Sequence, residues 1–599
     1  MKNQAVDYEK TANLVEMFFQ QAEVHKDTPF LWKVVGRAYQ PLSWSQVRTR
    51  VVALASGLID VGVKAGDRVV LVSENRPEWC IADLAIMAIG AITVPAYTTN
   101  TSHDHRHVLT DSGATAAIVS HGRFVKPLLS AAAHISHPPR VILMDHEDLK
   151  QNPGVPLYMW DDILERGAAK PASLRYADLT RQDIACIIYT SGTGGVPKGV
   201  MLSHGIILVN CMGAHDVLME LGLGRERFLS FLPLSHAYEH TAGQFFPIFL
   251  GAEIFYAEGL EALGRNMVMA RPTLVTAVPR LYELMRMKME HAVNKEGGWR
   301  ARLFHLALSL GMKRHRDKLS RTFVEFFLDL LCDVTVRRKV RAGFGGQLKG
   351  FVSGGAPLNP DIGYFFTALG VRLAQGYGQT EAGPLVSVNR PFSSKMESVG
   401  QPLKGVEMKI AADGEICVRG AMVMQGYWNN PEDTAETIDA QGWLHTGDVG
   451  FIDDDGHVFI TDRKKDIIVN SGGDNISPQR VEGFLTLEPE IAQAMVYGDR
   501  RPHLVAVLVP DDAVLRDITR AEGAAADLKT LASHPEVRRR LGDAVKKANR
   551  ELSSFESIRR FIVADQPFTI ENAMLTPTLK VRRHVIMQRW GEDLKKFYR

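Results

Sequence analysis

The chain has 599 residues, of which 45% are hydrophobic and 23% are charged, and its formal net charge at pH 7 is +2. This length exceeds what one hydrophobic core usually supports, so we expect two or more domains. The balanced charge gives no reason to expect nucleic acid as a partner, and the composition is typical of a globular protein.

The five cysteines are scattered, and none is in C-x-x-C spacing. We therefore expect neither a disulfide framework nor a zinc site, and a reducing, cytoplasmic compartment fits. The N-terminus carries Asp7 and Glu9 and no continuous apolar core, which argues against a signal peptide. No stretch reaches the roughly 18 apolar residues that a membrane span needs.

Short apolar runs alternate with helical patterns from about residue 45 to residue 350. We expect strands at 68–72, 91–94, 116–120, 141–144 and 184–190, and a helix at 79–90. Nearly continuous apolar strands separated by helices are typical of parallel sheets covered on both faces. The sequence therefore predicts an α/β fold with a large N-terminal domain of parallel-type sheets.

The segment 285–349 differs from its surroundings, with fifteen Lys or Arg against six Asp or Glu, an excess of nine. Its helical part, 300–331, also carries an apolar face that includes Leu303, Leu310 and Phe327. Two interpretations stay open. The segment packs on the core as an amphipathic excursion, or it docks peripherally on anionic lipid at the inner face of a membrane.

After Asp448 the sequence turns to short strands, which we assign to a β-structured subdomain. The charged run Asp462–Asp466 looks like a hinge. We place the domain boundary there, with an N-terminal domain at 1–462 and a small α/β domain at 463–599.

The strongest local signal is the segment Tyr189–Val200, which follows an apolar strand and is dense in glycine and hydroxyl groups. Free backbone N–H groups, hydroxyls and one lysine suit the binding of a triphosphate. The candidate residues are Thr190, Ser191, Gly192, Thr193, Gly194, Gly195 and Lys198. Pro197 precedes the lysine and Gly199 follows it, so the segment is not a Walker A loop.

This loop resembles the phosphate-binding signature of the adenylate-forming superfamily, and further blocks occur in the same order as in that superfamily. They are Pro233–His236, Ser353–Pro357, Gly376–Glu381, Gly442–Asp448, Asp462–Arg463 and Leu575–Lys580. The resemblance spans nearly the whole chain. It is strongest to long-chain fatty-acid–CoA ligases, through Ser353–Leu358 and Leu575–Lys580.

The resemblance implies a two-step reaction with ATP and Mg²⁺ as cofactors, a fatty acid as substrate and coenzyme A as co-substrate. The carboxylate attacks the α-phosphorus of ATP, so cations and donors must be fixed there in advance. Tyr377 is expected against the adenine, Thr380 at the α-phosphate, and Asp448 with Arg463 at the ribose. Glu381 and Thr190 are expected at the metal. The remaining nucleotide-site residues implied are Gly355, Ala356, Pro357, Gly376 and Gly378.

The resemblance makes Lys580 the catalytic residue of adenylation and places His236 near the acyl carboxylate. It also implies that the small domain is mobile and rotates after adenylation about a hinge at Lys465. In that movement Gly472 and Gly473 approach the pantetheine arm of coenzyme A, where a side chain would obstruct contact.

The chain departs from the family pattern at two positions: Gly194 replaces a threonine, and His240 stands where some long-chain ligases carry a gating tryptophan. The cluster His103–His107 invites a metal interpretation, but we assign it a surface or packing role. Three alternatives to a fatty acyl-CoA ligase stay open. They are an acyl-AMP ligase that delivers to a carrier protein, an aryl-acid ligase, and a non-catalytic lipid-binding relative.

Overall fold

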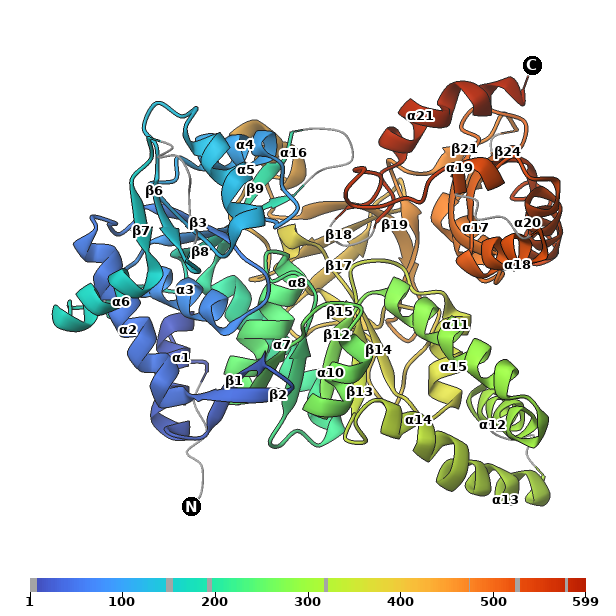
Figure 1. The fold of residues 1–599 in the computed structure, drawn as a ribbon, viewed down its shortest axis with the longest axis horizontal. Coiled ribbons are helices and arrows are strands. Elements are labelled where there is room, and N and C mark those ends of the chain that lie inside the picture. The colour runs from blue at the N-terminus through green and yellow to red at the C-terminus, as the bar shows by residue number, and fades with distance from the viewer. Residues whose placement is uncertain are drawn as a thin grey trace.

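The computed structural model describes residues 8–146, 154–190, 196–316, 322–472, 474–522, 528–576 and 580–598. Two large sheets covered by helices form the N-terminal part, a β-structured subdomain follows, and a smaller domain ends the chain (Figure 1). The predicted α/β class is confirmed.

The first large sheet has seven strands in the order β7-β6-β5-β3-β4-β8-β9, and all its pairs are parallel except β8 with β9. The strands are β3 (Arg68–Val72), β4 (Ile92–Pro95), β5 (Ala116–Val119), β6 (Arg140–Leu143), β7 (Leu157–Met159), β8 (Ile184–Thr190) and β9 (Lys198–Ser203). The helices on it are α2 (Trp44–Asp60), α3 (Pro77–Ala88), α4 (Ser102–Ser112), α5 (Gly122–Ala132) and α6 (Trp160–Ala169).

Burial on both faces explains the continuous apolar pattern of these strands. In β3, Val69 and Leu71 join one apolar cluster, and Val70 and Val72 join the other. Each cluster contains helix residues, so neither face of the sheet can be polar.

The second large sheet has nine strands in the order β16-β15-β14-β13-β12-β10-β11-β1-β2. They are β1 (Pro29–Val35), β2 (Ala38–Ser43), β10 (Arg227–Ser230), β11 (Glu253–Tyr256), β12 (Leu274–Ala277), β13 (Gly350–Ser353), β14 (Leu373–Tyr377), β15 (Ser387–Val388) and β16 (Gln401–Pro402). Around it lie α1 (Leu14–His25), η1 (Tyr176–Asp178), α7 (His204–Leu218), η2 (Met219–Leu221), α8 (Ala237–Glu239), η3 (His240–Phe245), α9 (Phe246–Leu250), α10 (Leu263–Ala270) and α15 (Pro360–Ala368).

The pairs that join β1, β11, β10, β12, β13 and β14 are parallel. Their carboxyl ends therefore meet along one edge, which is where ligands bind in open α/β sheets. Three of the sequence blocks, Pro233–His236, Ser353–Pro357 and Gly376–Glu381, begin at or just after that edge.

The basic segment forms separate helices rather than one continuous helical stretch. They are α11 (Pro279–Glu296), α12 (Gly298–Arg316) and α13 (Phe323–Cys332), followed by η4 (Asp333–Arg337) and α14 (Arg338–Gly343). Gly297 and Gly298 have φ of +63° and +61°, so α11 ends where α12 begins. In the described part of the chain, the helices all fall short of the length and apolar content that crossing a membrane requires.

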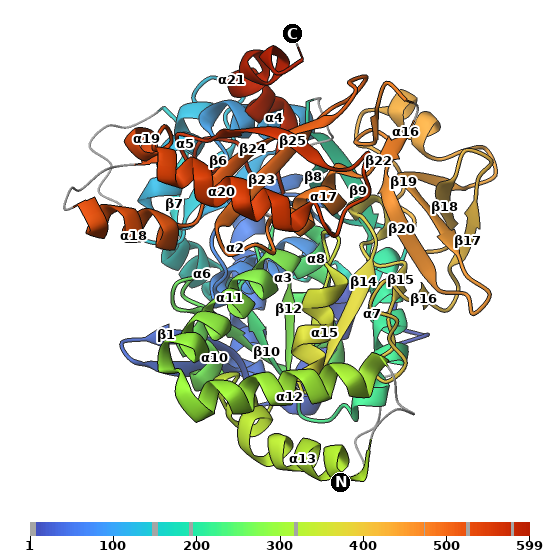
Figure 2. The same ribbon diagram turned by 90° about the vertical axis from the view of Figure 1, so that its right-hand side faces the viewer.

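The two halves of this segment bury different surfaces. On α12, Phe304, Ala307 and Leu310 are at most 5% exposed, and the helix packs on α15. Figure 2 shows α13 at the end of the molecule opposite α21 (Arg583–Lys596). Its large apolar side chains, among them Phe323 and Phe327, are exposed.

The β-structured subdomain contains β17 (Glu407–Ile410), β18 (Glu415–Arg419), β19 (Leu444–Ile452), β20 (Val458–Arg463) and α16 (Pro431–Thr437). The small domain contains β21 (Ile468–Val469), β22 (Asn475–Ile476), α17 (Pro478–Leu485), β23 (Ile491–Tyr497), β24 (Leu504–Pro510), α18 (Asp512–Glu522), α19 (Leu528–Leu531), α20 (Pro535–Ala548), β25 (Ile558–Val563) and α21. Its β23-β24-β25 sheet has apolar clusters of its own on both faces, so the domain has its own core.

Candidate active site

The glycine-rich segment connects β8 to β9, which pair antiparallel so that Thr190 faces Lys198. A strand therefore follows this segment, whereas a helix follows a Walker A loop. The residues Ser191, Gly192, Thr193, Gly194 and Gly195 lie outside the described part of the chain. At its described end, the Pro197 carbonyl oxygen is 2.8 Å from His107 Nε2 on α4.

Lys198 is held by two residues that the sequence interpretation did not single out. Its Nζ lies 2.6 Å from Asp433 Oδ2 on α16 and 5.1 Å from the ring centroid of Tyr427. The Lys198 ammonium lowers the pKa of Asp433. The Tyr427 hydroxyl in turn donates to Glu381 Oε1 at 3.0 Å. One tyrosine thus links the phosphate-loop lysine to the proposed metal ligand.

The turn directly after β14 is packed so closely that Gly378 leaves no room for a side chain. A Cβ on Gly378 would lie 2.0 Å from the Pro384 carbonyl oxygen, whereas one on Gly376 would meet the end of the Leu385 side chain, 2.8 Å from its Cδ1. Thr380, which begins the short turn η5 (Thr380–Ala382), is buried. The tight packing fixes the main chain that carries Tyr377 and Thr380.

Asp448 is a buried carboxylate with two partners. Tyr377 donates its hydroxyl proton to Asp448 Oδ2 at 2.8 Å, and Arg463 Nε donates to Asp448 Oδ1 at 2.8 Å. Burial and then the Asp448 charge raise the pKa of the Tyr377 phenol, so this hydroxyl stays a donor. Tyr377, which is expected at the adenine, and Arg463, which is expected at the ribose, thus both contact Asp448 directly.

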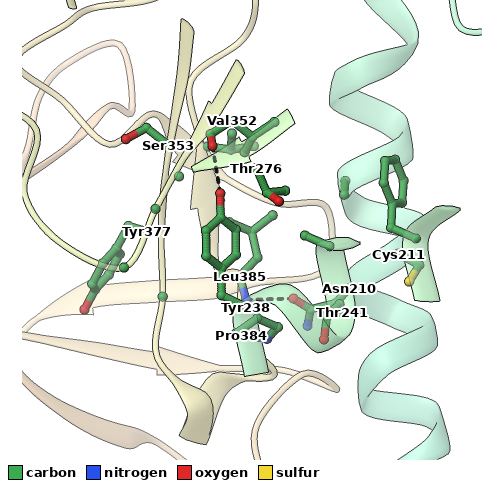
Figure 3. Close-up of a pocket in the computed structure, with 18 of the residues that line it drawn as sticks. Asn210, Cys211, Tyr238, Thr241, Thr276, Val352, Ser353, Tyr377, Pro384 and Leu385 are labelled. Atoms are coloured by element: carbon green, nitrogen blue, oxygen red, sulfur yellow. Dashed lines mark hydrogen bonds between the residues drawn. The ribbon is translucent and has the colours of Figure 1, made fainter. Parts of the chain in front are cut away.

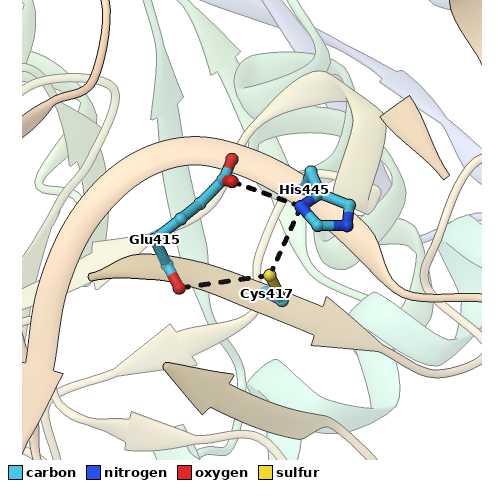
Figure 4. Close-up of side chains that lie close together, drawn as sticks. All are labelled: Glu415, Cys417 and His445. Atoms are coloured by element: carbon cyan, nitrogen blue, oxygen red, sulfur yellow. Dashed lines mark hydrogen bonds and ion pairs between the residues drawn. The ribbon is translucent and has the colours of Figure 1, made fainter. Parts of the chain in front are cut away.

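Glu415, Cys417 and His445 form a hydrogen-bonded cluster (Figure 4), and this cluster contacts the turn that carries Asp448. Glu415 Oε1 accepts from the Gly447 N–H at 2.8 Å, and Glu415 Oε2 lies 3.2 Å from His445 Nδ1. Cys417 Sγ is 3.6 Å from the same nitrogen, but burial raises the pKa of that thiol. Because the Lys464 ammonium also lies 3.2 Å from Glu415 Oε2, we interpret the cluster as a brace rather than a metal site.

Lys580 comes from the small domain and lies within the electrostatic field of these groups. Its side chain reaches solvent, but the surrounding protein removes water from its ammonium. This desolvation, and after it the positive charge of Arg463, lowers the pKa of Lys580 to about 8. Asp448 and Glu381 oppose that shift. Residues 577–579, which precede it, lie outside the described part of the chain.

His236 is a neutral hydrogen-bond donor in this arrangement. Its Nδ1 accepts from the Tyr238 N–H at 3.2 Å, so the proton of the neutral ring is on Nε2. Burial and then the Lys580 charge lower the pKa of His236 to about 4. At neutral pH the ring can therefore donate through Nε2 to an anionic oxygen.

One pocket, with an empty volume of about 920 Å³ including its open part, connects the nucleotide residues to an apolar recess (Figure 3). Its nucleotide side is lined by His236, Gly355, Gly376, Tyr377, Gly378 and Thr380. Its apolar side is lined by Ala214, Leu218, Phe228, Phe246, Leu274 and Val275. Between them, the Tyr238 hydroxyl donates to the Val352 carbonyl oxygen at 2.8 Å.

Several expected residues lie elsewhere. His240, at the expected gate position, is fully buried with its Nε2 2.8 Å from Asp83 Oδ2. Of the apolar run after it, Phe246 lines the pocket, whereas Phe245 and Ile248 belong to the core. Pro357 is exposed, and Ala356, beside it, is half-buried. Both follow the part of the Ser353–Pro357 loop that lines the pocket.

The cluster His103–His107 lies in the first half of α4, which begins at Ser102. Asp104 takes part in a capping box with Thr101, and His105 is buried. Because His107 contacts Pro197, the helix supports one end of the phosphate loop. This agrees with a packing role.

Lys464, directly before the expected hinge, is bonded to the large domain. The Lys464 N–H donates to the Gly447 carbonyl oxygen at 2.8 Å, and its Nζ lies 2.5 Å from Asp413 Oδ2. Lys465, the next residue, is exposed. In the small domain the Gly472 N–H donates to Asn470 Oδ1 at 2.9 Å, and Gly473 lies outside the described residues.

Comparisons with known protein families and with curated proteins point to the same family of enzymes. Residues 18–428 match the AMP-binding enzyme family, and residues 465–599 match the AMP-binding enzyme C-terminal domain. The chain is 33% identical to a long-chain-fatty-acid–CoA ligase of Mycobacterium bovis, covering 98% of this chain and 97% of the relative. It is 30% identical to a peroxisomal long chain acyl-CoA synthetase of Arabidopsis thaliana, covering 99% of this chain and 87% of the relative.

Among solved structures, the fold resembles the A domain of a carboxylic acid reductase from Segniliparus rugosus in complex with AMP and a co-purified carboxylic acid. The TM-score is 0.79 at 22% identity, and the match covers 98% of this chain and 94% of that one. At this identity the likeness establishes the fold alone.

Proposed function

Because the chain belongs to the AMP-binding enzyme family, we propose that it is an AMP-forming ligase that joins a long-chain fatty acid to coenzyme A. One observation carries the proposal. A single pocket joins the residues expected around the nucleotide to a recess lined by apolar side chains. The names of the relatives support the substrate class. They are a long-chain-fatty-acid–CoA ligase and a long chain acyl-CoA synthetase, and the matches cover 97% and 87% of their lengths.

In the first half-reaction, a carboxylate oxygen bonds to the α-phosphorus of ATP, and the bond to the β-phosphate breaks to release pyrophosphate. Lys580 and the Nε2–H of His236 offset the charge that gathers at this centre. Lys198 leaves Asp433 to bind the outgoing phosphates. Tyr377, Asp448 and Arg463 hold the nucleoside, and Thr380 binds the α-phosphate.

Glu381 and Thr190 fit a magnesium ion, since a carboxylate and a hydroxyl are hard oxygen ligands. When bound there, Mg²⁺ would neutralise phosphate charge. The chain's own part is to hold Glu381 in position, and the Tyr427 hydroxyl does this.

In the second half-reaction, the thiol sulfur of coenzyme A bonds to the acyl carbonyl carbon while the bond to AMP breaks. AMP leaves, and the thiol proton is released. We propose that the small domain rotates about Lys465 between the halves. The expected boundary at 462/463 falls within β20, so the part that rotates is the chain beyond Lys465. The anchoring of Lys464 in the large domain, immediately before an exposed Lys465, supports that position. The rotation brings the loop containing Gly472 and Gly473 to the pantetheine arm.

The test is pyrophosphate release from ATP and palmitate, measured with and without coenzyme A. We expect multiple turnovers with coenzyme A and about one equivalent of pyrophosphate without it. Turnover with a carrier protein but not with coenzyme A would favour the acyl-AMP ligase alternative. Absence of release with every acid tested, aromatic acids included, would overturn the enzyme assignment and leave a lipid-binding protein.

We also propose that the segment 285–349 contacts an anionic membrane surface. The support is the outward face of α13 and η4, whose large apolar side chains are all at least 50% exposed. They are Phe323, Val324, Phe326, Phe327, Leu330, Leu331 and Val334. The segment has an excess of nine basic residues, and Arg338 and Lys339 directly after this face are exposed. Such a surface gains from apolar burial and from attraction to anionic lipid.

The membrane contact is tested by co-sedimentation with vesicles of phosphatidylglycerol and of phosphatidylcholine. The triple variant Phe326→Ser, Phe327→Ser, Leu330→Ser should lose binding, whereas Phe392→Ser, which changes an exposed phenylalanine elsewhere, should keep it. Binding should be stronger to phosphatidylglycerol and should weaken with salt. Equal vesicle binding by the wild type and the triple variant would refute a lipid partner. So would a triple variant that no longer dimerises but still binds vesicles as the wild type does.

A further inference from the structure

A hydrogen bond from Arg280 joins the large domain to the small one. Arg280 is in the first turn of α11, and its Nη2 donates to the Ala492 carbonyl oxygen on β23 at 2.6 Å. Its Nη1 donates to Glu283 Oε2 at 2.7 Å, and Glu283 is one turn further along the same helix. The carboxylate therefore holds the guanidinium toward the small domain.

Apolar packing accompanies this bond. Leu487, which follows α17 of the small domain, packs against a large-domain cluster that includes the buried Tyr282 and Phe365. Leu281 and Met285 of α11 pack against the same cluster. The large domain thus meets the small domain here through one charged donor on α11 and through the apolar cluster on which Leu487 packs.

These contacts exist while Lys580 is in the nucleotide site. The segment that leads into α21 reaches from the small domain to β19 of the large domain (Figure 1), and Lys580 on it is within range of the charges of Arg463, Asp448 and Glu381. This is the arrangement that the proposed adenylation step needs. Arg280 belongs to the large domain, and Ala492 lies beyond Lys465. A rotation about Lys465 would move the carbonyl oxygen away from the guanidinium.

We propose that Arg280 is a positioning residue that latches the small domain in the adenylation arrangement. The inference rests on the proposed two-step function and adds a residue that neither the sequence blocks nor the pocket contains. The latch acts on the balance between two arrangements, so its loss shifts that balance away from adenylation. A hydrogen bond from a charged donor corresponds to a shift of about tenfold.

The experiment measures the two half-reactions separately in the full-length protein. Pyrophosphate release from ATP and palmitate reports adenylation, and thioester formation from supplied palmitoyl-AMP and coenzyme A reports transfer. Arg280→Ala should lower the first rate about tenfold and leave the second unchanged or raised. Leu487→Ala should act in the same direction, and Arg280→Lys should restore part of the first rate.

Lys288→Ala is the matched control, because Lys288 lies on the same helix and is exposed. It should leave both half-reactions unchanged. Equal losses of both half-reactions in Arg280→Ala, or no change in either, would overturn the latch. An inactive wild type would instead overturn the proposed function, so the two failures are distinguishable. If Arg280→Ala does not fold, the same criteria are applied to Leu487→Ala.

Discussion

The two sides of the nucleotide site are held in different ways. On the large-domain side, Asp448 is fixed by Tyr377, Arg463 and a turn that Glu415 braces, and all of these contacts are within hydrogen-bond distance. On the other side, Lys580 is carried on a loop of the small domain. Its main-chain N–H donates to Thr576 Oγ1 and its carbonyl oxygen accepts from the Thr576 N–H, and both bonds stay within that loop. Preorganised groups can serve both half-reactions, whereas a group that arrives with a domain can serve one and then leave.

The largest expected effect is that of Lys580→Ala. Loss of a charge donor at the reacting centre should lower adenylation by about 100- to 1,000-fold. Transfer from supplied palmitoyl-AMP should be spared, because the lysine is needed only where charge gathers on the phosphate. Single-turnover rates of the two half-reactions check this, with the surface variant Lys595→Ala as control. Comparable losses in both halves would place Lys580 with the fixed groups.

Asp448→Asn should reduce both half-reactions, by about 10- to 100-fold each. The substitution removes the charged acceptor and leaves the Arg463 guanidinium without its counter-ion. The same pair of rate measurements applies, with Asp455→Asn in an exposed turn as control. A loss confined to one half-reaction would contradict the idea that the large-domain side is used throughout.

The pH dependence should also separate the two sides. The pKa of Lys580 is lowered to about 8, so its charged, active form disappears as pH rises through that value. Adenylation should therefore fall about fivefold from pH 8 to pH 9, while transfer from palmitoyl-AMP should not follow this titration. Lys580→Arg, which stays charged, should remove the decline. A decline that persists in Lys580→Arg would assign the titration to another group.

The smallest effect is expected from Tyr427→Phe. Glu381 would lose one hydrogen-bond donor, and the Mg²⁺ concentration for half-maximal adenylation should rise about threefold. The comparison is a magnesium titration of wild type and variant, with Tyr598→Phe as control because its hydroxyl bonds stay within the small domain. An unchanged titration would mean that Tyr427 acts only on Lys198.

Much of the fold was predictable because its signals are local. The strands at 68–72 and 184–190 have the predicted bounds, since apolar runs between helical patterns directly report burial on both faces. The motifs that carry Lys198, Tyr377, Asp448 and Lys580 are likewise contiguous, and the resemblance could be read from them without a structure.

The basic segment shows where local pattern stops being enough. In sequence both α12 and α13 carry apolar side chains at helical spacing, and both interpretations of the segment stayed open. The structure buries the face of α12 against α15 and leaves that of α13 exposed. A period indicates that a helix has an apolar face, but only the neighbouring elements decide what covers that face.

By itself, the sequence determined the class of chemistry, the order of the motifs and most element positions, because each depends on residues that are close along the chain. Only the tertiary structure decided the partners: Tyr377 with Asp448, 71 positions apart, and Arg280 with Ala492, 212 positions apart. It also showed that Tyr427 and Asp433 support the site. The reason is that a side chain's partner depends on how distant elements pack, which no local pattern records.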